Sequence, residues 1–112
     1  MHFFSLHSSS FVEEIKTEID LNRLLIPSQK PTLLSFSDTD SSSFIWRGFS
    51  SYFWGKLNFA WVPKTNTKVR KVFLDNDQIL PSYHAIVEGR VLNFSGSHNF
   101  TSILDFIEEI TL

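Results

Sequence analysis

Apolar residues along the chain follow two periods in turn, which predicts alternating strands and helices. The segment HFFSL (2–6) is a short apolar run of strand-forming residues. A helix is expected to begin at Ser10, because Ser10 and Glu13 have the spacing of a capping box. The apolar residues that follow recur at helical intervals: Val12, Ile15 and Ile19.

A second strand and helix are expected after a linker bracketed by Pro27 and Pro31. TLLSF (32–36) has the length and apolarity of a buried strand. The aromatic-rich segment FIWRGFSSYFW (44–54) then repeats apolar residues every four positions, as one face of a helix does: Ile45, Phe49 and Phe53.

The third expected strand is followed by a short helix. Residues 57–62 alternate in the period of a strand, and Pro63 ends it. A short helix is then expected, entered through Thr65 or Thr67 and carrying three apolar residues: Val69, Val72 and Phe73.

The last third of the chain predicts a hairpin and a closing helix. Strands are expected over 83–87 and 90–94, joined by a turn at Glu88-Gly89 whose glycine supplies the positive φ of a tight hairpin. An amphipathic helix follows, with one apolar face: Phe100, Ile103, Leu104, Ile107 and Ile110. The alternation implies parallel strands with right-handed crossovers plus an antiparallel edge, so the fold class is an α/β sandwich.

Composition limits the function classes. The 112 residues, 42% hydrophobic, suffice for one domain over 1–112, which could be part of a larger protein. Ten basic and twelve acidic residues are scattered along the chain, which argues against nucleic acid. No apolar stretch approaches the roughly 20 residues that cross a bilayer, and the N-terminus lacks the pattern of a secretory signal. We expect a monomeric domain with no cofactor and no membrane insertion.

The C-terminal half resembles the thioredoxin fold. ILPS (79–82), a strand, the turn at 88–89, a strand ending at Gly96 and an amphipathic helix are similar to that family in order and spacing. In the family the proline, here Pro81, is cis and faces the active site. The N-terminal half is similar to the start of protein disulfide isomerase domains. The resemblance implies a mixed central sheet of about five strands flanked by about four helices.

The chain departs from the family at its reactive centre. Where the family carries a Cys-x-x-Cys pair, this chain has DSSSF (40–44), and it contains no cysteine at all. A serine hydroxyl cannot replace a thiolate in thiol–disulfide exchange, because its pKa is far higher and it forms no redox couple. The resemblance therefore implies a redox-inactive, non-enzymatic domain that serves as a structural or polypeptide-binding module. A pure scaffold without a peptide site is the alternative.

A client polypeptide is expected where the family has its redox centre. In catalytic relatives the backbone beside the proline accepts an extended peptide, which implies this role for Leu80 and Pro81. The residues expected beside them are Ser41, Ser42, Phe44 and Trp46. The alternative is that the proline only shapes the loop before the next strand.

The helix expected over 44–54 carries more aromatic side chains than one buried face requires. Four of them lie off its apolar stripe: Phe44, Trp46, Tyr52 and Trp54. They indicate either burial on both sides of the helix or a surface for a partner.

A phosphotransfer enzyme is the alternative from another function class. Asp38-Thr-Asp40 directly follows an apolar strand and resembles the paired aspartates of haloacid-dehalogenase-type phosphatases. Against it, the chain is short for that family, and aspartate after a strand is usually a loop or cap residue. The four histidines, including His84, lack the close spacing of a zinc site.

Two glycosylation sequons bear on location: Asn93-Phe-Ser95 and Asn99-Phe-Thr101. Disulfide-isomerase-like domains reside in the secretory pathway. We therefore expect the endoplasmic reticulum lumen rather than the cytoplasm.

Overall fold

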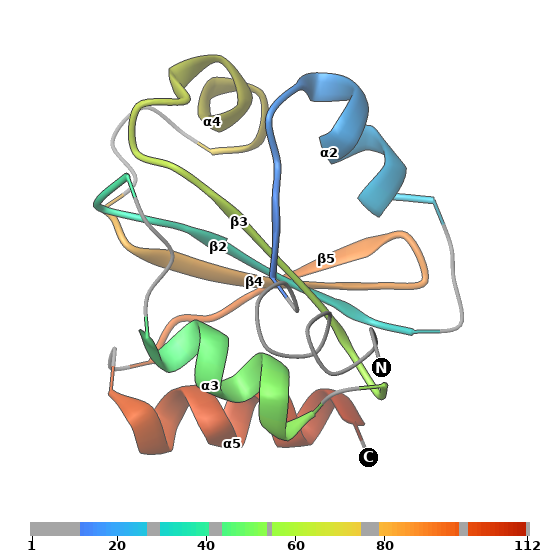
Figure 1. Ribbon diagram of the computed structural model, residues 1–112. Coiled ribbons are helices and arrows are strands. Elements are labelled where there is room, and N and C mark those ends of the chain that lie inside the picture. The colour runs from blue at the N-terminus through green and yellow to red at the C-terminus, as the bar shows by residue number, and fades with distance from the viewer. Residues whose placement is uncertain are drawn as a thin grey trace, which may run out of the picture.

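The fold is a three-layer sandwich, with one sheet between two pairs of helices (Figure 1). The computed structural model describes residues 12–26, 30–40, 44–53 (side chains from 46), 55–74, 79–96 and 99–111. The strands are β1 (Val12–Glu14), β2 (Thr32–Phe36), β3 (Asn58–Val62), β4 (Ser82–Val87) and β5 (Arg90–Asn93). The helices are α2 (Glu18–Leu24), α3 (Phe44–Tyr52), α4 (Thr67–Phe73) and α5 (Phe100–Thr111).

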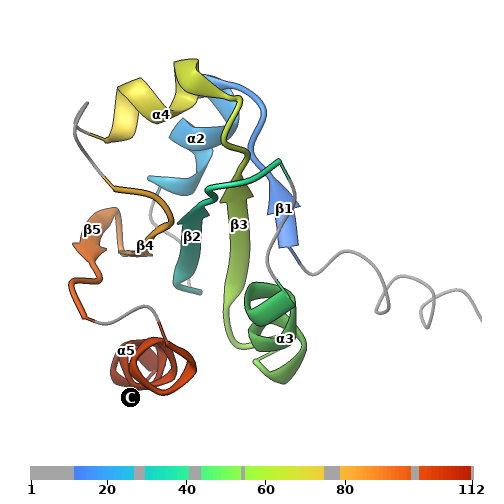
Figure 2. The same ribbon diagram turned by 90° about the vertical axis from the view of Figure 1, so that its left-hand side faces the viewer.

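The sheet is mixed, with its strands in the order β1-β3-β2-β4-β5. β1, β3 and β2 run parallel, while β4 is antiparallel to β2 and β5 is antiparallel to β4. Figure 2 shows α2 and α4 beyond one face of this sheet and α3 and α5 beyond the other. The expected alternation of strands and helices, followed by a hairpin and a closing helix, is confirmed.

The hairpin has the expected two-residue turn. Val87 pairs with Arg90, and the two residues between them both have positive φ, 52° at Glu88 and 79° at Gly89. Two positive φ values define a type I′ turn, whose twist matches that of the flanking strands. The turn therefore sets the register of the whole β4–β5 pair.

The N-terminal prediction is wrong in part. Residues 12–14 form strand β1, paired with β3, instead of the first turn of a helix. The helix begins at Glu18, because Thr17 and Asp20 form a reciprocal capping box. Ile19, expected on the apolar face, is 72% exposed. The strand expected over 2–6 and the expected cap Ser10 lie outside the described residues.

The start of α4 also differs from the prediction. Its N-cap is Asn66, whose Oδ1 accepts a hydrogen bond from the Val69 backbone N–H at 3.3 Å. The Asn66 side chain also donates to the carbonyls of Ile15 and Lys16, at 3.3 and 3.0 Å. A residue that caps one helix and also binds the segment before another satisfies more backbone groups than either threonine would.

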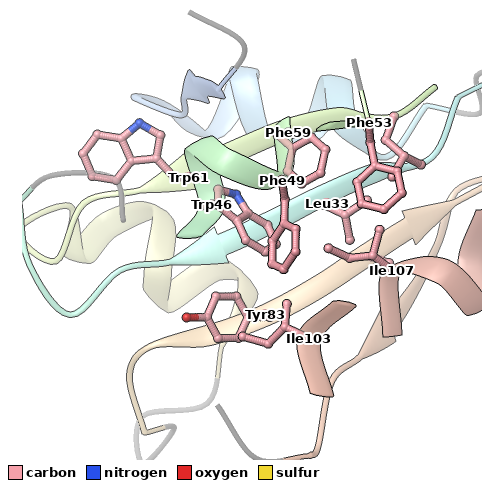
Figure 3. Close-up of a cluster of buried hydrophobic side chains, with 11 residues drawn as sticks. Leu33, Trp46, Phe49, Phe53, Phe59, Trp61, Tyr83, Ile103 and Ile107 are labelled. Atoms are coloured by element: carbon pink, nitrogen blue, oxygen red, sulfur yellow. The ribbon is translucent and has the colours of Figure 1, made fainter. Parts of the chain in front are cut away.

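Alternate side chains of the strands form two apolar clusters, one on each face of the sheet. The α3/α5 cluster lies between the sheet and helices α3 and α5 (Figure 3) and is rich in aromatic residues: Leu33, Trp46, Phe49, Phe53, Leu57, Phe59, Trp61, Tyr83, Ala85, Ile103 and Ile107. The α2/α4 cluster is mostly aliphatic: Ile15, Leu21, Leu34, Phe36, Ala60, Val62, Val69, Leu74 and Ile86. None of the helices in the described ranges has the length and apolarity that crossing a bilayer requires.

Candidate functional site

Pro81 lies at the tip of the central strand. Phe36, the last residue of β2, pairs with Ser82, so Pro81 directly precedes that pair. The Leu80–Pro81 peptide bond is cis. Leu80 is half-buried and packs against the α2/α4 cluster, whereas Ile79 is 77% exposed. The loop therefore presents an exposed isoleucine and anchors itself through the leucine beside it.

Three of the other expected site residues cannot be placed in this surface. Ser41 and Ser42 lie outside the described residues. Phe44 is the first residue of α3, but its side chain also lies outside the described part of the chain. Their role beside Leu80 and Pro81 stays a prediction.

Trp46 corrects the sequence prediction, because its side chain lies in the core. It is 1% exposed, and its Nε1–H donates to the Ala60 carbonyl at 3.0 Å. Its ring packs against Phe59 and Tyr83, with centroids 5.3 and 5.2 Å away. An indole held on both sides in this way contributes nothing to an exposed surface. For this residue, burial on both sides of α3 is the correct interpretation.

Among the aromatic side chains of α3 that the structure describes, Tyr52 is the one that reaches the surface, with 76% of it exposed. Together with Phe100 of α5, which is 55% exposed, it lines a pocket of about 420 Å³ over Gly48. Trp54 lies outside the described residues.

The two aspartates after β2 belong to a loop that is hydrogen-bonded to the segment following β3. The Thr65 backbone N–H donates to Asp40 Oδ1 at 3.3 Å, and the Lys64 N–H donates to the Thr39 carbonyl at 2.9 Å. Burial, and then the nearby Asp38 carboxylate, raise the pKa of Tyr83. No group of three potential metal ligands occurs among the described residues. The loop thus supplies structural contacts and adds no support to the phosphotransfer alternative.

A larger pocket of about 520 Å³ opens beside β5, and we call it the β5 pocket. Its walls come from the ends of α2 and α4 and from the hairpin: Leu25, Val72, Phe73, Leu74, His84, Val91, Asn93, Phe94 and Ser95. Val72 is 54% exposed and Val91 is 38% exposed, so apolar surface reaches solvent here. This is the combination of an apolar floor and a few polar groups that ligand sites share.

A hydrogen-bonded chain of polar side chains reaches the β5 pocket through His84 and Asn93. His84 Nδ1 lies 2.7 Å from Asn93 Oδ1, and its Nε2 lies 3.0 Å from Ser82 Oγ. Because an amide oxygen only accepts, Nδ1 carries the proton and Nε2 accepts from the Ser82 hydroxyl. The rings of Phe36 and Phe73 stand edge-on to the imidazole. Burial lowers the pKa of His84, and the hydrogen bond that His84 donates to Asn93 opposes that shift in part.

Helix α4, whose Val72 and Phe73 line the β5 pocket, is basic. Lys68 and Lys71 are exposed and Arg70 is half-exposed, and α4 contains no acidic residue. Arg90, at the start of β5, is exposed as well, but it projects to the other face of the sheet, because its partner Val87 packs against the α3/α5 cluster. The surface around the pocket therefore favours an acidic ligand over a basic one.

The analysis of the sequence alone missed the β5 pocket, although one signal for its floor was present. A two-residue turn at 88–89 fixes the register of the hairpin, and counting outward from it places His84 opposite Asn93. No comparable signal marks Leu25 and Val72, because they come together only when α2 and α4 pack on the same face of the sheet.

Solved structures share this fold. The thioredoxin of Malassezia sympodialis has a TM-score of 0.73 at 11% identity, covering 90% of this chain and 91% of its own. The J-Trx1 fragment of ERdj5 has a TM-score of 0.70 at 14% identity, covering 90% of this chain and 52% of its own. The zinc-bound form of human ERp44 has a TM-score of 0.72 at 11% identity, covering 98% and 29%.

These likenesses confirm the predicted fold class. The chain has a thioredoxin-like fold, and it lacks the cysteine pair because it has no cysteine. It spans about half the length of the ERdj5 fragment. No protein-family profile and no curated protein matches the sequence.

Proposed function

We propose that this chain is a redox-inactive thioredoxin-like domain that binds an unfolded segment of polypeptide. The absence of cysteine argues against thiol–disulfide oxidoreductase activity, because exchange begins with attack by a thiolate. With a thiol donor present, insulin should be reduced at the uncatalysed rate. Reduction clearly above that rate would contradict the proposal.

The β5 pocket is the observation that carries the binding role. It offers about 520 Å³ of space with leucine, valine and phenylalanine side chains in its walls. A pure scaffold domain has no need of partly exposed apolar residues such as Val72 and Val91 at one place. The exposed Ile79 and the half-buried Leu80 and Pro81 lie in the loop that leads into β4, whose His84 lines the pocket.

The predicted client site around Ser41, Ser42, Phe44, Leu80 and Pro81 is kept as part of this proposal. We propose that a client extends from this loop into the β5 pocket. The domain would then act within a larger protein, as the coverage of 52% of the ERdj5 fragment and 29% of ERp44 suggests.

An NMR titration tests the binding role directly. Reduced and carboxymethylated α-lactalbumin, a permanently unfolded polypeptide, is added to the ¹⁵N-labelled chain. The expected result is a set of concentration-dependent shifts at Ile79, Leu80 and the residues of the β5 pocket, with little change at Tyr52 on the opposite face. Spectra that do not change at millimolar polypeptide would favour the scaffold alternative.

We further propose the endoplasmic reticulum lumen as the location. The support is the sequon at Asn99, an exposed residue outside the β5 pocket. A chain expressed with a secretory leader in cultured cells should show reduced mobility that an N-glycosidase reverses. Asn99→Gln is the control, and full-length localisation to the cytoplasm would contradict the proposal.

A further inference from the structure

We infer that β5 accepts an extended polypeptide as an added strand, with an apolar side chain of that polypeptide in the β5 pocket and acidic residues beside it. The inference rests on the proposed function and names the binding mode and the class of client. Three features of the described residues support it: the free edge of β5, the side-chain alternation along that strand and the charge of α4.

The outer edge of β5 is open to pairing. β5 is the last strand of the sheet in the described part of the chain, and all four of its residues are exposed. Natural proteins protect such edges with bulges, prolines or lysines. β5 is short and begins with Arg90, but its sequence RVLN contains no proline or lysine and its register with β4 is unbroken.

The register shows which backbone groups point outward. The Phe94 N–H donates to the Tyr83 carbonyl at 3.0 Å. In an antiparallel pair, hydrogen-bonded and non-hydrogen-bonded residues alternate. Leu92 therefore turns its N–H and C=O toward β4, while Val91 and Asn93 turn theirs away from β4. These two residues offer the donors and acceptors that a further strand needs.

The same two residues line the β5 pocket with their side chains. Residues that lie opposite each other on neighbouring strands project to the same face of the sheet. We call the added polypeptide the guest. A guest residue opposite Val91 or Asn93 therefore points its side chain to the α2/α4 face, toward Leu25 and Val72. In known cases of strand addition, main-chain hydrogen bonds supply the affinity. Pockets for alternate side chains supply the specificity.

The charges of α4 and β5 favour particular residues in the guest on either side of the side chain that enters the pocket. Lys68 and Lys71 are exposed on α4, which has no acidic residue. Arg90 begins β5 and projects to the α3/α5 face, as do the neighbours of a guest residue whose side chain enters the pocket. An acidic guest gains attraction from these groups, and a basic guest is repelled. The client class is therefore an extended segment of alternating apolar residues with acidic neighbours.

Backbone methylation of a synthetic guest tests strand addition. The probe is the acetylated and amidated heptapeptide DVTITVD, compared with one version N-methylated at its three apolar positions and another N-methylated at its two threonines. Only one of these sets can direct its N–H groups at β5. We expect one methylated peptide to bind at least about tenfold more weakly than the other, because it loses hydrogen bonds to Val91 and Asn93. Equal affinity of all three peptides would overturn the inference.

A variant of β5 gives an independent test. Val91→Pro removes the outward N–H and leaves the bonds to β4 in place, a position where an edge strand tolerates proline. Val91→Ala is the matched control, since it shortens the side chain and keeps the N–H. Affinity for DVTITVD should fall further in Val91→Pro than in Val91→Ala, and equal affinity would contradict strand addition. If Val91→Pro does not fold, the affinities of the methylated peptides for the unaltered chain test strand addition instead.

The charge and the proposed function are tested separately. KVTITVK should bind more weakly than DVTITVD at low salt, and equal affinity would remove the acidic residues from the inference. Where unfolded α-lactalbumin shifts the pocket resonances and the three DVTITVD peptides bind equally, strand addition is wrong and the proposed function stands. Where neither α-lactalbumin nor DVTITVD binds, both are wrong.

Discussion

The two faces of the sheet are built from different kinds of side chain. The α3/α5 cluster holds two buried tryptophans, and one of them, Trp46, packs its ring against Phe59 and Tyr83. The α2/α4 cluster is mostly aliphatic, and its helices α2 and α4 have only seven residues each, against nine and twelve for α3 and α5. Polar groups are buried on this face as well, through His84 and Ser82.

This difference separates the face that carries the larger packed core from the face that holds the proposed binding pocket. Large rings fill the space under α3 and α5, because each aromatic side chain removes much surface from water. Short helices on the other face cover less of the sheet and leave the β5 pocket open between their ends and the hairpin. We expect substitutions on the first face to change stability and substitutions on the second to change binding.

The largest effect is expected from Trp46. Trp46→Ala should lower the free energy of unfolding by about 3–5 kcal/mol, because it leaves a cavity and removes the hydrogen bond from the indole to the Ala60 carbonyl. Phe73→Ala, on the pocket side, should cost less than half as much, since Phe73 is only half-buried. Urea unfolding measures both values. Equal losses would contradict the comparison, and Trp46→Phe, expected to cost about 1–2 kcal/mol, serves where Trp46→Ala does not fold.

Asn66 comes next, because it holds together the two helices of the thinner face. Asn66→Ala should cost about 1–2 kcal/mol, through loss of the cap of α4 and of the bonds to Ile15 and Lys16. Thr67→Ala is the matched control and should change the free energy of unfolding by less than about 0.5 kcal/mol. A larger loss in Thr67→Ala than in Asn66→Ala would show that the threonine is the true cap.

Between pH 7.5 and 5.5, a pH dependence of stability is expected from the α2/α4 face. The unfolded pKa of histidine is about 6.5, and burial lowers the pKa of His84 in the folded chain. Above pH 6.5 its contribution to stability is fully present, and it is lost as the pH falls toward the folded pKa, because the unfolded chain then binds the extra proton. The free energy of unfolding should therefore decrease between pH 7.5 and 5.5, by at most about 1.4 kcal/mol per pH unit. His84→Gln should flatten this slope, and an unchanged slope would assign it to other groups.

The smallest change in stability is expected from a surface substitution with a large effect on binding. Val72→Glu should alter the free energy of unfolding by less than about 0.5 kcal/mol, because Val72 is 54% exposed on a helix. It places a negative charge in the wall of the β5 pocket and should abolish the NMR shifts caused by unfolded α-lactalbumin. Ile19→Glu, on α2 outside the pocket, is the control and should bind normally. If both variants bind equally well, the β5 pocket is not the binding surface.

Most of the element order follows from local signals. The periodicity of residues 100–110 predicts α5, the turn at Glu88-Gly89 predicts the hairpin, and the apolar run 32–36 predicts β2. These signals act over a few residues, so the sequence displays them directly. The absence of cysteine is likewise evident from the sequence and argues against thiol–disulfide exchange.

The residues around 12–19 show where local signals fail. Val12, Ile15 and Ile19 have helical spacing, yet Val12 lies in β1, Ile15 is fully buried and Ile19 is exposed. Pairing with β3, which lies more than forty residues further along the chain, decides this segment. A short strand at the edge of a sheet gains its hydrogen bonds from a distant partner, and no local pattern records that partner.

The sequence by itself determined the class of fold, the turn that sets the hairpin register and the loss of thiol chemistry. Only the tertiary structure decided that Trp46 is buried and that Val72 and Val91 lie in the walls of the same pocket. The reason is that exposure depends on which helix covers which part of the sheet. That coverage is set by contacts between segments far apart along the chain, whereas turns and periodicity are set by neighbours.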